Sequence, residues 1–329
     1  MIDNSGMNND GQMQSGGMKR SRTVKIRVPG TSANCGSGFD TLGVACTLYN
    51  NLELTLFSEP TLIIENEGAG KEYIATDERN MVWRAIVELL KAAGKDKEYL
   101  GAHIRMTNDV PLSRGIGSSA AAIVAGLKGA NVLIDNYFNR HELFQIATKM
   151  EGHPDNVAPA IFGGFTVSIM SHGIAETFSF MPRMYIRLVI AVPDFPLSTK
   201  AAREALPKNV SMRDAVFNIG RASMLVAALS HGNEKFLRHA FDDKLHQPYR
   251  AKLIPGMYDV FHAARAEGAL GVSISGAGSS LIAYTHKNEE AVGDAMREAF
   301  KKNGVDAKIL HLGIDKRGAH IVNHDAARA

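Results

Sequence analysis

The chain has 329 residues, of which 45% are hydrophobic and 22% are charged, a composition typical of a globular protein with one large domain or two. Its 37 basic and 34 acidic residues leave a net charge of +3, which is too balanced for a nucleic-acid-binding surface. Since no apolar run is long enough to span a bilayer, we expect a protein that binds neither membrane nor nucleic acid.

The N-terminal segment is predicted to be a disordered tail over residues 1–20. Gly, Asn, Gln and Ser dominate its first 17 residues, which lack the apolar core of a signal peptide. Met18 is an alternative start, which the sequence leaves open. The two cysteines, Cys35 and Cys46, lack a Cys-x-x-Cys spacing. Together these features favour a cytoplasmic protein with reduced thiols.

Strands and helices alternate through the first half of the chain. Residues 24–28 alternate apolar and polar side chains until Pro29 and Gly30 interrupt them. Asn80 is a good N-cap for an apolar segment of helical period that Gly94 ends. On such patterns we predict strands at 24–28, 51–56, 103–106 and 162–169, and helices at 81–93, 118–135 and 141–150.

Residues 111–122 read PLSRGIGSSAAA and indicate a binding site for an anion. Gly115 and Gly117 leave the backbone free to take a positive φ and to approach a ligand closely. Ser118 and Ser119 are good N-caps for the alanine-rich helix that follows. A glycine turn that leads into a helix directs unpaired N–H groups and the positive end of the helix dipole at one point. Phosphate is the expected occupant.

The second half has the element order of a ferredoxin-like domain. A strand precedes two helices, two strands around the turn 276–278, a further helix and a last strand, which is the order of a split βαβ unit. We predict strands at 185–192, 270–275, 280–284 and 306–312, and helices at 213–230, 255–267 and 288–302. The chain is therefore divided near residue 175, into domains at 21–175 and 176–329.

Three motifs in order make the chain resemble the GHMP kinases, a superfamily that includes galactokinase, homoserine kinase, mevalonate kinase and phosphomevalonate kinase. The motifs are VPGTSANCGSGFDTLGVA from Val28, PLSRGIGSSAAA from Pro111 and SISGAGSSLIAY from Ser273. Two further segments, EGHPDNVAPAIFGGF at 151–165 and HQPYRAKLIPG at 246–256, resemble the homoserine kinases in particular. The similarity runs from about residue 24 to residue 312.

The resemblance implies an α+β fold of two domains, a ribosomal-S5-domain-2-like N-terminal domain and a ferredoxin-like C-terminal domain. It implies an enzyme that uses ATP to phosphorylate the hydroxyl of L-homoserine, giving O-phospho-L-homoserine for threonine biosynthesis. ATP is expected to contact the residues of the phosphate loop, which are Pro111, Leu112, Ser113, Arg114, Gly115, Ile116, Gly117, Ser118, Ser119, Ala120 and Ala121.

The substrate implied by the resemblance is a zwitterion with a hydroxyl group. Its pocket needs an acid for the ammonium group and an arginine for the carboxylate. Asp40 is expected to bind the ammonium group, and Arg203 and Arg250 the carboxylate. Asp155 is expected to orient the hydroxyl group, and whether it also accepts the proton stays open. The remaining expected site residues are Asn34, which shares the catalytic role with Asp155, together with His153 and Gly276.

The resemblance also implies a Mg²⁺ ion held by a phosphate-loop serine, Ser118 or Ser119, and a carboxylate. Homoserine kinases often carry a Glu eight residues before the His of the HPDN segment, and Gln145 stands there in this chain. A neutral amide is a poorer Mg²⁺ ligand than a carboxylate. Either the metal site at Gln145 is therefore weaker, or Glu142 or Glu151 replaces it.

Two other functions are compatible with the sequence. The first is another small-molecule kinase of the same superfamily, although Asp40 would repel the carboxylate of a mevalonate-like substrate. The second is a non-catalytic sensor that binds nucleotide without transfer, for which Gln145 is the support. A homodimer is also compatible with the sequence. For the adenine ring, Asn66 and residues 79–83 are the candidates.

Overall fold

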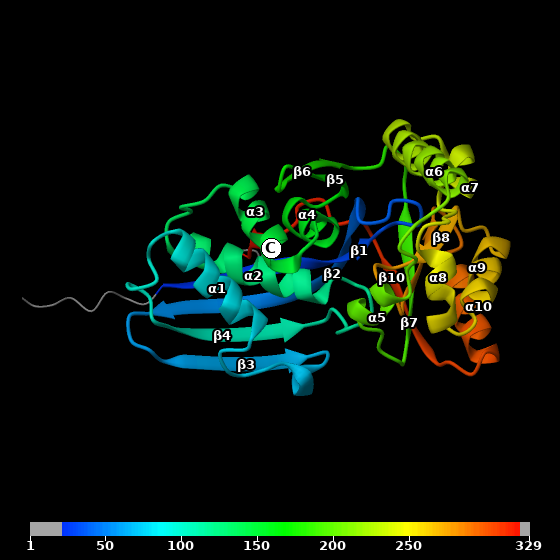
Figure 1. Ribbon diagram of the computed structural model, residues 1–329. Coiled ribbons are helices and arrows are strands. Elements are labelled where there is room, and N and C mark those ends of the chain that lie inside the picture. The colour runs from blue at the N-terminus through cyan, green and yellow to red at the C-terminus, as the bar shows by residue number, and fades with distance from the viewer. Residues whose placement is uncertain (1–21, 323–329) are drawn as a thin grey trace, which may run out of the picture.

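The computed structural model describes residues 22–322, and the tail predicted at 1–20 lies outside them. The described chain folds into two domains that lie side by side (Figure 1). Cys35 and Cys46 are buried in it as free thiols. None of the helices in this part of the chain is long and apolar enough to cross a membrane.

The first domain is a mixed sheet with helices packed over it (Figure 1). Within residues 22–322 the sheet has seven strands, in the order β11-β1-β2-β4-β3, with β5 and β6 continuing from β2. The strands are β1 (Thr23–Ala33), β2 (Leu42–Phe57), β3 (Leu62–Gly68), β4 (Gly101–Asn108), β5 (Phe165–Ser171), β6 (Ile174–Phe180) and β11 (His320–Ile321). The helices are α1 (Met81–Ala92), α2 (Ser118–Leu133), α3 (Arg140–Glu151) and α4 (Pro154–Phe162).

The second domain has the ferredoxin-like topology that the element order predicts. In the described chain its sheet has four strands in the order β10-β7-β9-β8, all antiparallel to their neighbours. The strands are β7 (Arg187–Pro193), β8 (Gly271–Ile274), β9 (Leu281–Thr285) and β10 (Ala307–Leu312). The helices are α5 (Thr199–Glu204), α6 (Met212–His231), α7 (Leu237–Ala240), α8 (Gln247–Arg250), α9 (Met257–Ala266) and α10 (Glu289–Lys302). The predicted two-domain α+β fold is confirmed.

Local sequence signals explain where several of these elements begin and end. Asn80 caps α1 as predicted, because its side chain accepts from the N–H groups of Val82 and Trp83. The prediction that Ser118 or Ser119 caps α2 is wrong. Gly117 occupies the N-cap with φ 66°, a conformation that a glycine adopts at no steric cost, and both serines lie inside the first turn.

Helix α2 is buried on nearly every side, which holds its N-terminus in one place. It packs between α1, α3 and the strands β1 and β2. Small side chains allow this close approach, since Ala120, Ala121 and Ala125 lie in the core of the first domain. The phosphate loop therefore leads into a rigid helix.

Several elements have no counterpart among the predicted ones, chiefly β3, α4, β6 and β11. The predicted division at residue 175 falls inside β6, which pairs with β5 in the first sheet. After β10 the chain crosses back to the first domain, where Ile321 of β11 lies opposite Ile26 of β1. The two domains are therefore joined by chain segments in both directions, which helps to fix the cleft between them.

Candidate active site

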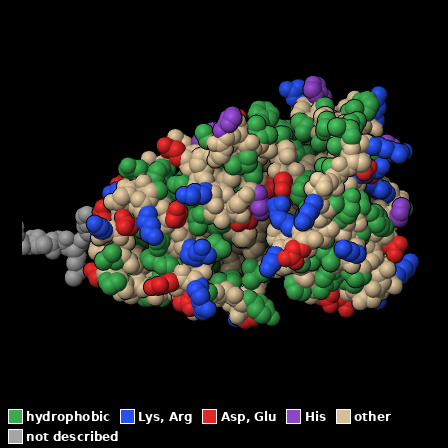
Figure 2. Space-filling model, in the orientation of Figure 1, with side chains coloured by type: hydrophobic (Ala, Val, Ile, Leu, Met, Phe, Trp, Pro, Cys, Tyr) green, Lys and Arg blue, Asp and Glu red, His purple; other side chains and the backbone are tan. Residues whose placement is uncertain are grey.

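A cleft of about 330 Å³ lies where the two domains meet, a volume within the range of small-molecule sites. Figure 2 shows a hollow between the two halves of the molecule, with basic side chains along its rim. The first domain contributes the loop 111–119 and the start of α4, and the second contributes Arg203, Arg250 and the turn 276–278. Most of the residues expected to bind ATP or homoserine therefore line one cleft.

The two glycines of the phosphate loop are required by close contacts as well as by conformation. Gly115 has φ 75° and Gly117 has φ 66°. A Cβ atom on Gly115 would lie 2.1 Å from the carbonyl oxygen of Ser275, and one on Gly117 would lie 1.9 Å from Oγ1 of Thr31. Because a glycine N-cap has no side chain to accept from the first-turn amides, the N–H groups at the start of α2 are available to a ligand.

The phosphate loop is fastened to the second domain. Nε of Arg114 donates to the carbonyl oxygen of Pro193 at 3.0 Å, and its Nη2 donates to that of Asp194 at 3.0 Å. Oγ of Ser275 donates to the carbonyl oxygen of Gly115 at 2.7 Å. The Arg114 guanidinium, expected to contact ATP, is thus engaged with the end of β7. Ala120, expected to contact ATP as well, points with Ala121 into the core.

Ser119 faces a carboxylate across the start of α2. Its Oγ donates to Oε1 of Glu151, the last residue of α3, at 2.6 Å, and both residues line the cleft. Burial raises the pKa of the Glu151 carboxyl above its ordinary value, and the Ser119 hydrogen bond opposes that effect. The described residues contain no group of three or more His, Cys, Asp or Glu side chains that could enclose a metal ion.

Gln145, expected to be the metal ligand, is not brought to the cleft. Its Nε2 donates to the carbonyl oxygen of Ala175 at 2.7 Å, and its Oε1 accepts from the N–H of the same residue at 2.9 Å. The amide therefore ties α3 to the β6 edge of the sheet. Glu142, one of the two alternatives, completes the capping box at the start of α3 with Asn139. Glu151 is the alternative that the structure places in the cleft.

His153 and Asp155 form a close pair at the start of α4. Nδ1 of His153 lies 2.6 Å from Oδ1 of Asp155, whose side chain is only 3% exposed. The hydrogen bond to Asp155 is the main cause that raises the pKa of His153 above its ordinary value of 6.5. The next residue, Asn156, also lines the cleft, and its Oδ1 accepts from Oγ1 of Thr31 at 2.8 Å. Asn156 was missed because HPDN has the composition of an ordinary turn.

Asp40 and Arg203 meet across the cleft, one from each domain. Both carboxylate oxygens of Asp40 accept from the guanidinium, from Nη1 and Nη2 at 2.9 Å each. The hydrogen bond to Asp40 raises the pKa of Arg203 further above its ordinary value. Each side chain keeps more than a third of its surface exposed, at 36% and 40%. An ion pair this exposed contributes about 0–1 kcal/mol, so a ligand that supplies both charges can displace it.

Asn34 connects the first motif to the third. Its Nδ2 donates to the carbonyl oxygen of Gly276 at 2.7 Å, and its Oδ1 accepts from the backbone N–H of Asp40 at 3.0 Å. Asn34 itself takes a left-handed conformation with φ 70° and is 3% exposed. Both ends of its amide are therefore committed to backbone groups, which holds Asp40 and Gly276 at the cleft.

Arg250 reaches the same place from α8 with its side chain almost wholly buried. Its Nε donates to the carbonyl oxygen of Ala202 at 3.3 Å, and its Nη1 donates to that of Gly276 at 3.1 Å and to Nδ1 of His246 at 3.2 Å. Burial, with the nearby charge of Arg203 as the second cause, lowers the pKa of Arg250 to about 10. The guanidinium therefore stays charged at neutral pH.

A further group of lining residues, from the first domain, is largely apolar. It consists of Ile74, Asn80, Met81, Val82, Met106 and Asn108. Three of these lie in the predicted adenine segment 79–83, whereas Arg79 pairs with Asp77 on the surface. The other candidate, Asn66, is not at the lining, although both polar atoms of its side chain are buried without a partner in the described chain.

Two protein families match segments of the chain. The GHMP kinases N terminal domain family matches residues 80–164, and the GHMP kinases C terminal family matches residues 224–302. The first segment contains the phosphate loop, α3 and the start of α4, and the second contains Arg250 and the turn 276–278.

Relatives of known name match almost the whole chain. Over 296 residues it is 42% identical to the homoserine kinase of Carboxydothermus hydrogenoformans, covering 90% of this chain and 96% of that protein. Over 299 residues it is 41% identical to the homoserine kinase of Moorella thermoacetica, covering 90% and 99%. Its fold is similar to the crystal structure of homoserine kinase from Cytophaga hutchinsonii, with a TM-score of 0.84 and 30% identity over 93% and 99% of the two chains.

Proposed function

The chain belongs to the homoserine kinases of the GHMP kinase superfamily, and we propose that its cleft transfers the γ-phosphoryl group of ATP to the hydroxyl group of L-homoserine. As a homoserine kinase it is an enzyme of amino-acid biosynthesis. The observation that carries the proposal for the cleft is that the free N-terminus of α2 and the charged trio Asp40, Arg203 and Arg250 open on the same space.

In the proposed arrangement the two halves of the cleft bind the two reactants. The N–H groups at the start of α2 bind the triphosphate of ATP, whose charge the helix dipole favours. Arg203 and Arg250 bind the carboxylate of homoserine, and Asp40 binds its ammonium group. When the Asp40–Arg203 ion pair opens, each residue needs a new partner of opposite charge. A zwitterion provides an ammonium group for Asp40 and a carboxylate for Arg203, so the site favours it over a ligand with a single charge.

We assign Asp155 to the orientation of the reacting hydroxyl. One of its oxygens, Oδ1, is engaged by His153, which leaves Oδ2 for the substrate. The hydroxyl oxygen attacks the γ-phosphorus in line with the bond to the β-phosphate oxygen, which breaks as the new P–O bond forms. The hydroxyl proton leaves to Oδ2 of Asp155 or to an oxygen of the transferred phosphoryl group. Because such a transition state is loose, positioning contributes more than a strong base. Asn34 acts by holding Asp40 and Gly276.

The finer proposal concerns Mg²⁺, for which Ser119 and Glu151 supply two hard oxygen ligands 2.6 Å apart. Such an open pair suits an ion that keeps several waters and binds phosphate oxygens. When bound, the ion neutralises the charge of the phosphate groups. Glu151 thereby takes the place predicted for Gln145. The homodimer and the cytoplasmic location stay predictions, the first of which light scattering on the full chain tests.

A coupled assay of ADP release tests the proposed reaction. We expect turnover with L-homoserine and little with mevalonate or galactose. A nucleotide-binding sensor would instead bind ATP in calorimetry and release no ADP at any Mg²⁺ concentration. Such a result, or a preference for another acceptor, would contradict the proposal.

The same assay tests the metal ligand. Glu151→Gln is expected to raise the Mg²⁺ concentration for half-maximal rate by about 10-fold or more, because a neutral amide replaces a carboxylate ligand. Gln145→Glu is the matched control on the same helix, and we expect it to leave the Mg²⁺ requirement unchanged. A changed requirement in Gln145→Glu with none in Glu151→Gln would restore the original assignment.

A further inference from the structure

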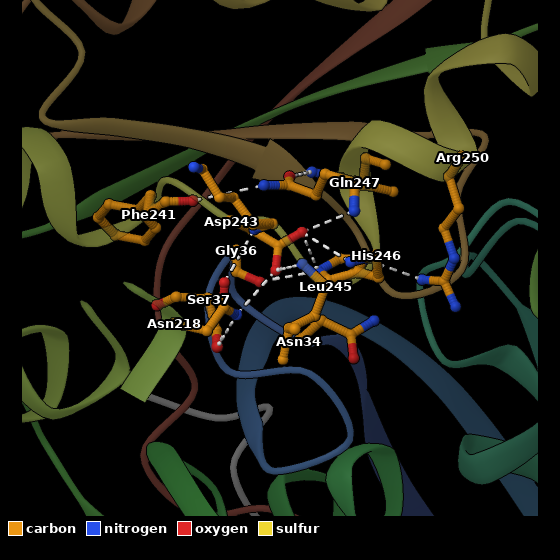
Figure 3. A network of polar contacts seen from close by, with 12 residues as sticks. Asn34, Gly36, Ser37, Asn218, Phe241, Asp243, Leu245, His246, Gln247 and Arg250 are labelled. Carbon is orange, nitrogen blue, oxygen red and sulfur yellow. Dashed lines mark hydrogen bonds and ion pairs between the residues drawn. The ribbon is translucent and has the colours of Figure 1, made fainter. Parts of the chain in front are cut away.

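A buried carboxylate lies behind the arginine of the substrate site. The side chain of Asp243 is 0% exposed, and its Oδ2 accepts from the backbone N–H groups of His246 at 2.9 Å and Gln247 at 2.6 Å. Its Oδ1 accepts from the N–H of Leu245 at 2.9 Å and from Nδ2 of Asn218 at 2.8 Å. Figure 3 shows these contacts converging on one carboxylate. Asp243 therefore fixes the backbone from which α8 begins.

His246 lies between this carboxylate and the cleft, and it is 0% exposed. Its Nε2 lies 2.7 Å from the carbonyl oxygen of Gly36, in the first domain. Since a carbonyl oxygen can only accept, Nε2 carries the proton and donates. Burial lowers the pKa of the ring below its ordinary value of 6.5, so the ring is neutral and Nδ1 is an acceptor.

The acceptor at Nδ1 is used by the substrate-site arginine. Nη1 of Arg250, at the other end of α8, donates to it at 3.2 Å, a contact that Figure 3 draws. The Phe39 ring stacks on the imidazole with centroids 5.2 Å apart, and the Arg250 guanidinium carbon lies 5.4 Å from the same ring. One histidine thus contacts the first domain through Nε2 and the guanidinium through Nδ1.

We propose that His246 is a positioning residue for homoserine, which aims the Arg250 guanidinium at the substrate carboxylate and locks α8 to the Gly36 turn of the first domain. The inference rests on the role proposed above for Arg250. The proposal requires a neutral ring whose Nδ1 is unprotonated. A proton on Nδ1 would place two N–H donors, one from the ring and one from Arg250, against each other, and the hydrogen bond would be lost. Because His246 contacts no residue of the phosphate loop in the described chain, we expect its substitution to change the KM for homoserine and not the KM for ATP.

Two substitutions separate the two contacts of the ring. The amide of an asparagine falls near the position of Nδ1, and that of a glutamine near Nε2. We therefore expect His246→Asn to keep a KM for homoserine within about 3-fold of the wild type, and His246→Gln to raise it by about 10-fold. Neither is expected to change kcat or the KM for ATP by more than about 3-fold. Equal effects of both variants, or a loss that includes the KM for ATP, would overturn the proposal.

Asn218→Leu is the matched control for stability. It removes a buried donor from the same carboxylate and from the carbonyl oxygen of Ser37, and an acceptor from the N–H of Lys244, but it removes no contact of the His246 ring or of Arg250. We therefore expect a lower melting temperature and an unchanged KM for homoserine. If it raised this KM as much as His246→Gln does, the effect would be general loosening and the proposal would fall. A double variant adds a second check, since His246→Gln in an Arg250→Gln background is expected to have no further effect on the KM.

A measurement on the unsubstituted protein covers the case in which the His246 variants do not fold. In histidine-selective ¹⁵N spectra we expect one ring with Nε2 protonated and Nδ1 bare whose Nδ1 signal shifts on addition of L-homoserine but not of ATP. A protonated Nδ1, or a signal insensitive to homoserine, would overturn the inference. Failure of the proposed function is distinguishable, because the wild-type enzyme would then release no ADP with homoserine.

Discussion

The two halves of the cleft are built in different ways. The phosphate half is a run of nine consecutive residues, 111–119, whose useful groups are backbone N–H donors and a helix N-terminus. The homoserine half is made of side chains far apart in the chain, such as Asp40 and Arg203, which are separated by 163 positions. The first half depends on backbone conformation, and the second depends on long-range contacts that hold each side chain.

This difference decides what each half tolerates. At the phosphate half, apart from Ser119 and Glu151, which are proposed to bind Mg²⁺, a change of side chain matters little unless it adds a Cβ atom where the backbone is crowded, as at Gly115 or Gly117. At the homoserine half the charged side chains have to keep the hydrogen bonds that orient them toward the substrate. We therefore expect the backbone of the phosphate half to be disrupted by steric changes, and the homoserine half to be disrupted by the loss of polar contacts.

The largest effect is expected from Gly117→Ala. The new Cβ atom would lie 1.9 Å from Oγ1 of Thr31, and a residue other than glycine would be strained at φ 66°. Displacement of the loop by about an ångström is expected to lower kcat/KM for ATP by about 100-fold. Steady-state kinetics with varied ATP measure it.

Gly94→Ala is the matched control for the conformational part of this effect. Gly94 also has φ 66°, yet a Cβ atom there would meet nothing within 4 Å in the described chain. It should cost about 1 kcal/mol of stability and leave the kinetics unchanged. Normal kinetics with ATP in Gly117→Ala would show that the loop does not cradle the phosphates.

A smaller effect is expected at the homoserine half from Arg203→Gln. Loss of one charge-assisted contact to the carboxylate should raise the KM for homoserine by about 10-fold, with the KM for ATP unchanged. Arg297→Gln is the control, because Arg297 pairs with Asp294 on the surface of α10. A rise in the KM for ATP as well would contradict the prediction, because it would mean that the two halves of the cleft do not bind their ligands independently.

The same difference explains what could be predicted from sequence. The phosphate loop was predictable because its glycines, serines and helix are contiguous, and so were the helices with clear caps such as α1. Strand β3 was missed because it ends in the polar run Glu65–Gly68 at the edge of the sheet, and β11 because it is two residues long. Helix α4 begins with Pro154 at its first position, a start signal that is weak without an apolar helical period after it, and no helix was predicted there.

What the sequence could not indicate at the site is helical phase and long-range pairing. Gln145 and Glu151 lie on the same helix, and six residues correspond to a rotation of about 240°, so the two point to different neighbours. The hydrophobic periodicity of α3 does not show which of these two side chains faces the cleft, because that depends on where α2 and β6 lie. The contact of His246 with Gly36 spans 210 positions, and nothing local in HQPYR indicates it. Such pairings follow from how the domains meet.

The smallest effect is expected in the pH dependence of stability. The phosphate half depends on backbone groups that do not titrate, whereas the homoserine half contains the buried His246. Burial lowers the pKa of His246 from its ordinary value of 6.5 in the folded state; the facing carboxylate of Asp243 opposes this shift, and the guanidinium of Arg250 adds to it. Below pH 6.5 the unfolded chain therefore binds a proton that the folded chain refuses, and stability falls as the pH falls.

His246→Asn removes this penalty, so its melting temperature relative to the wild type should rise as the pH falls from about 7 to about 5, by about 2 °C for each unit of pKa shift. Asn218→Leu is the reference, because it changes stability in the same network without removing a titratable group. Its difference from the wild type should be the same at each pH. Melting curves that run parallel for His246→Asn as well would mean that the buried ring takes up its proton in the folded state. Arg250 would then have lost its acceptor, and the homoserine half would rest on its other contacts alone.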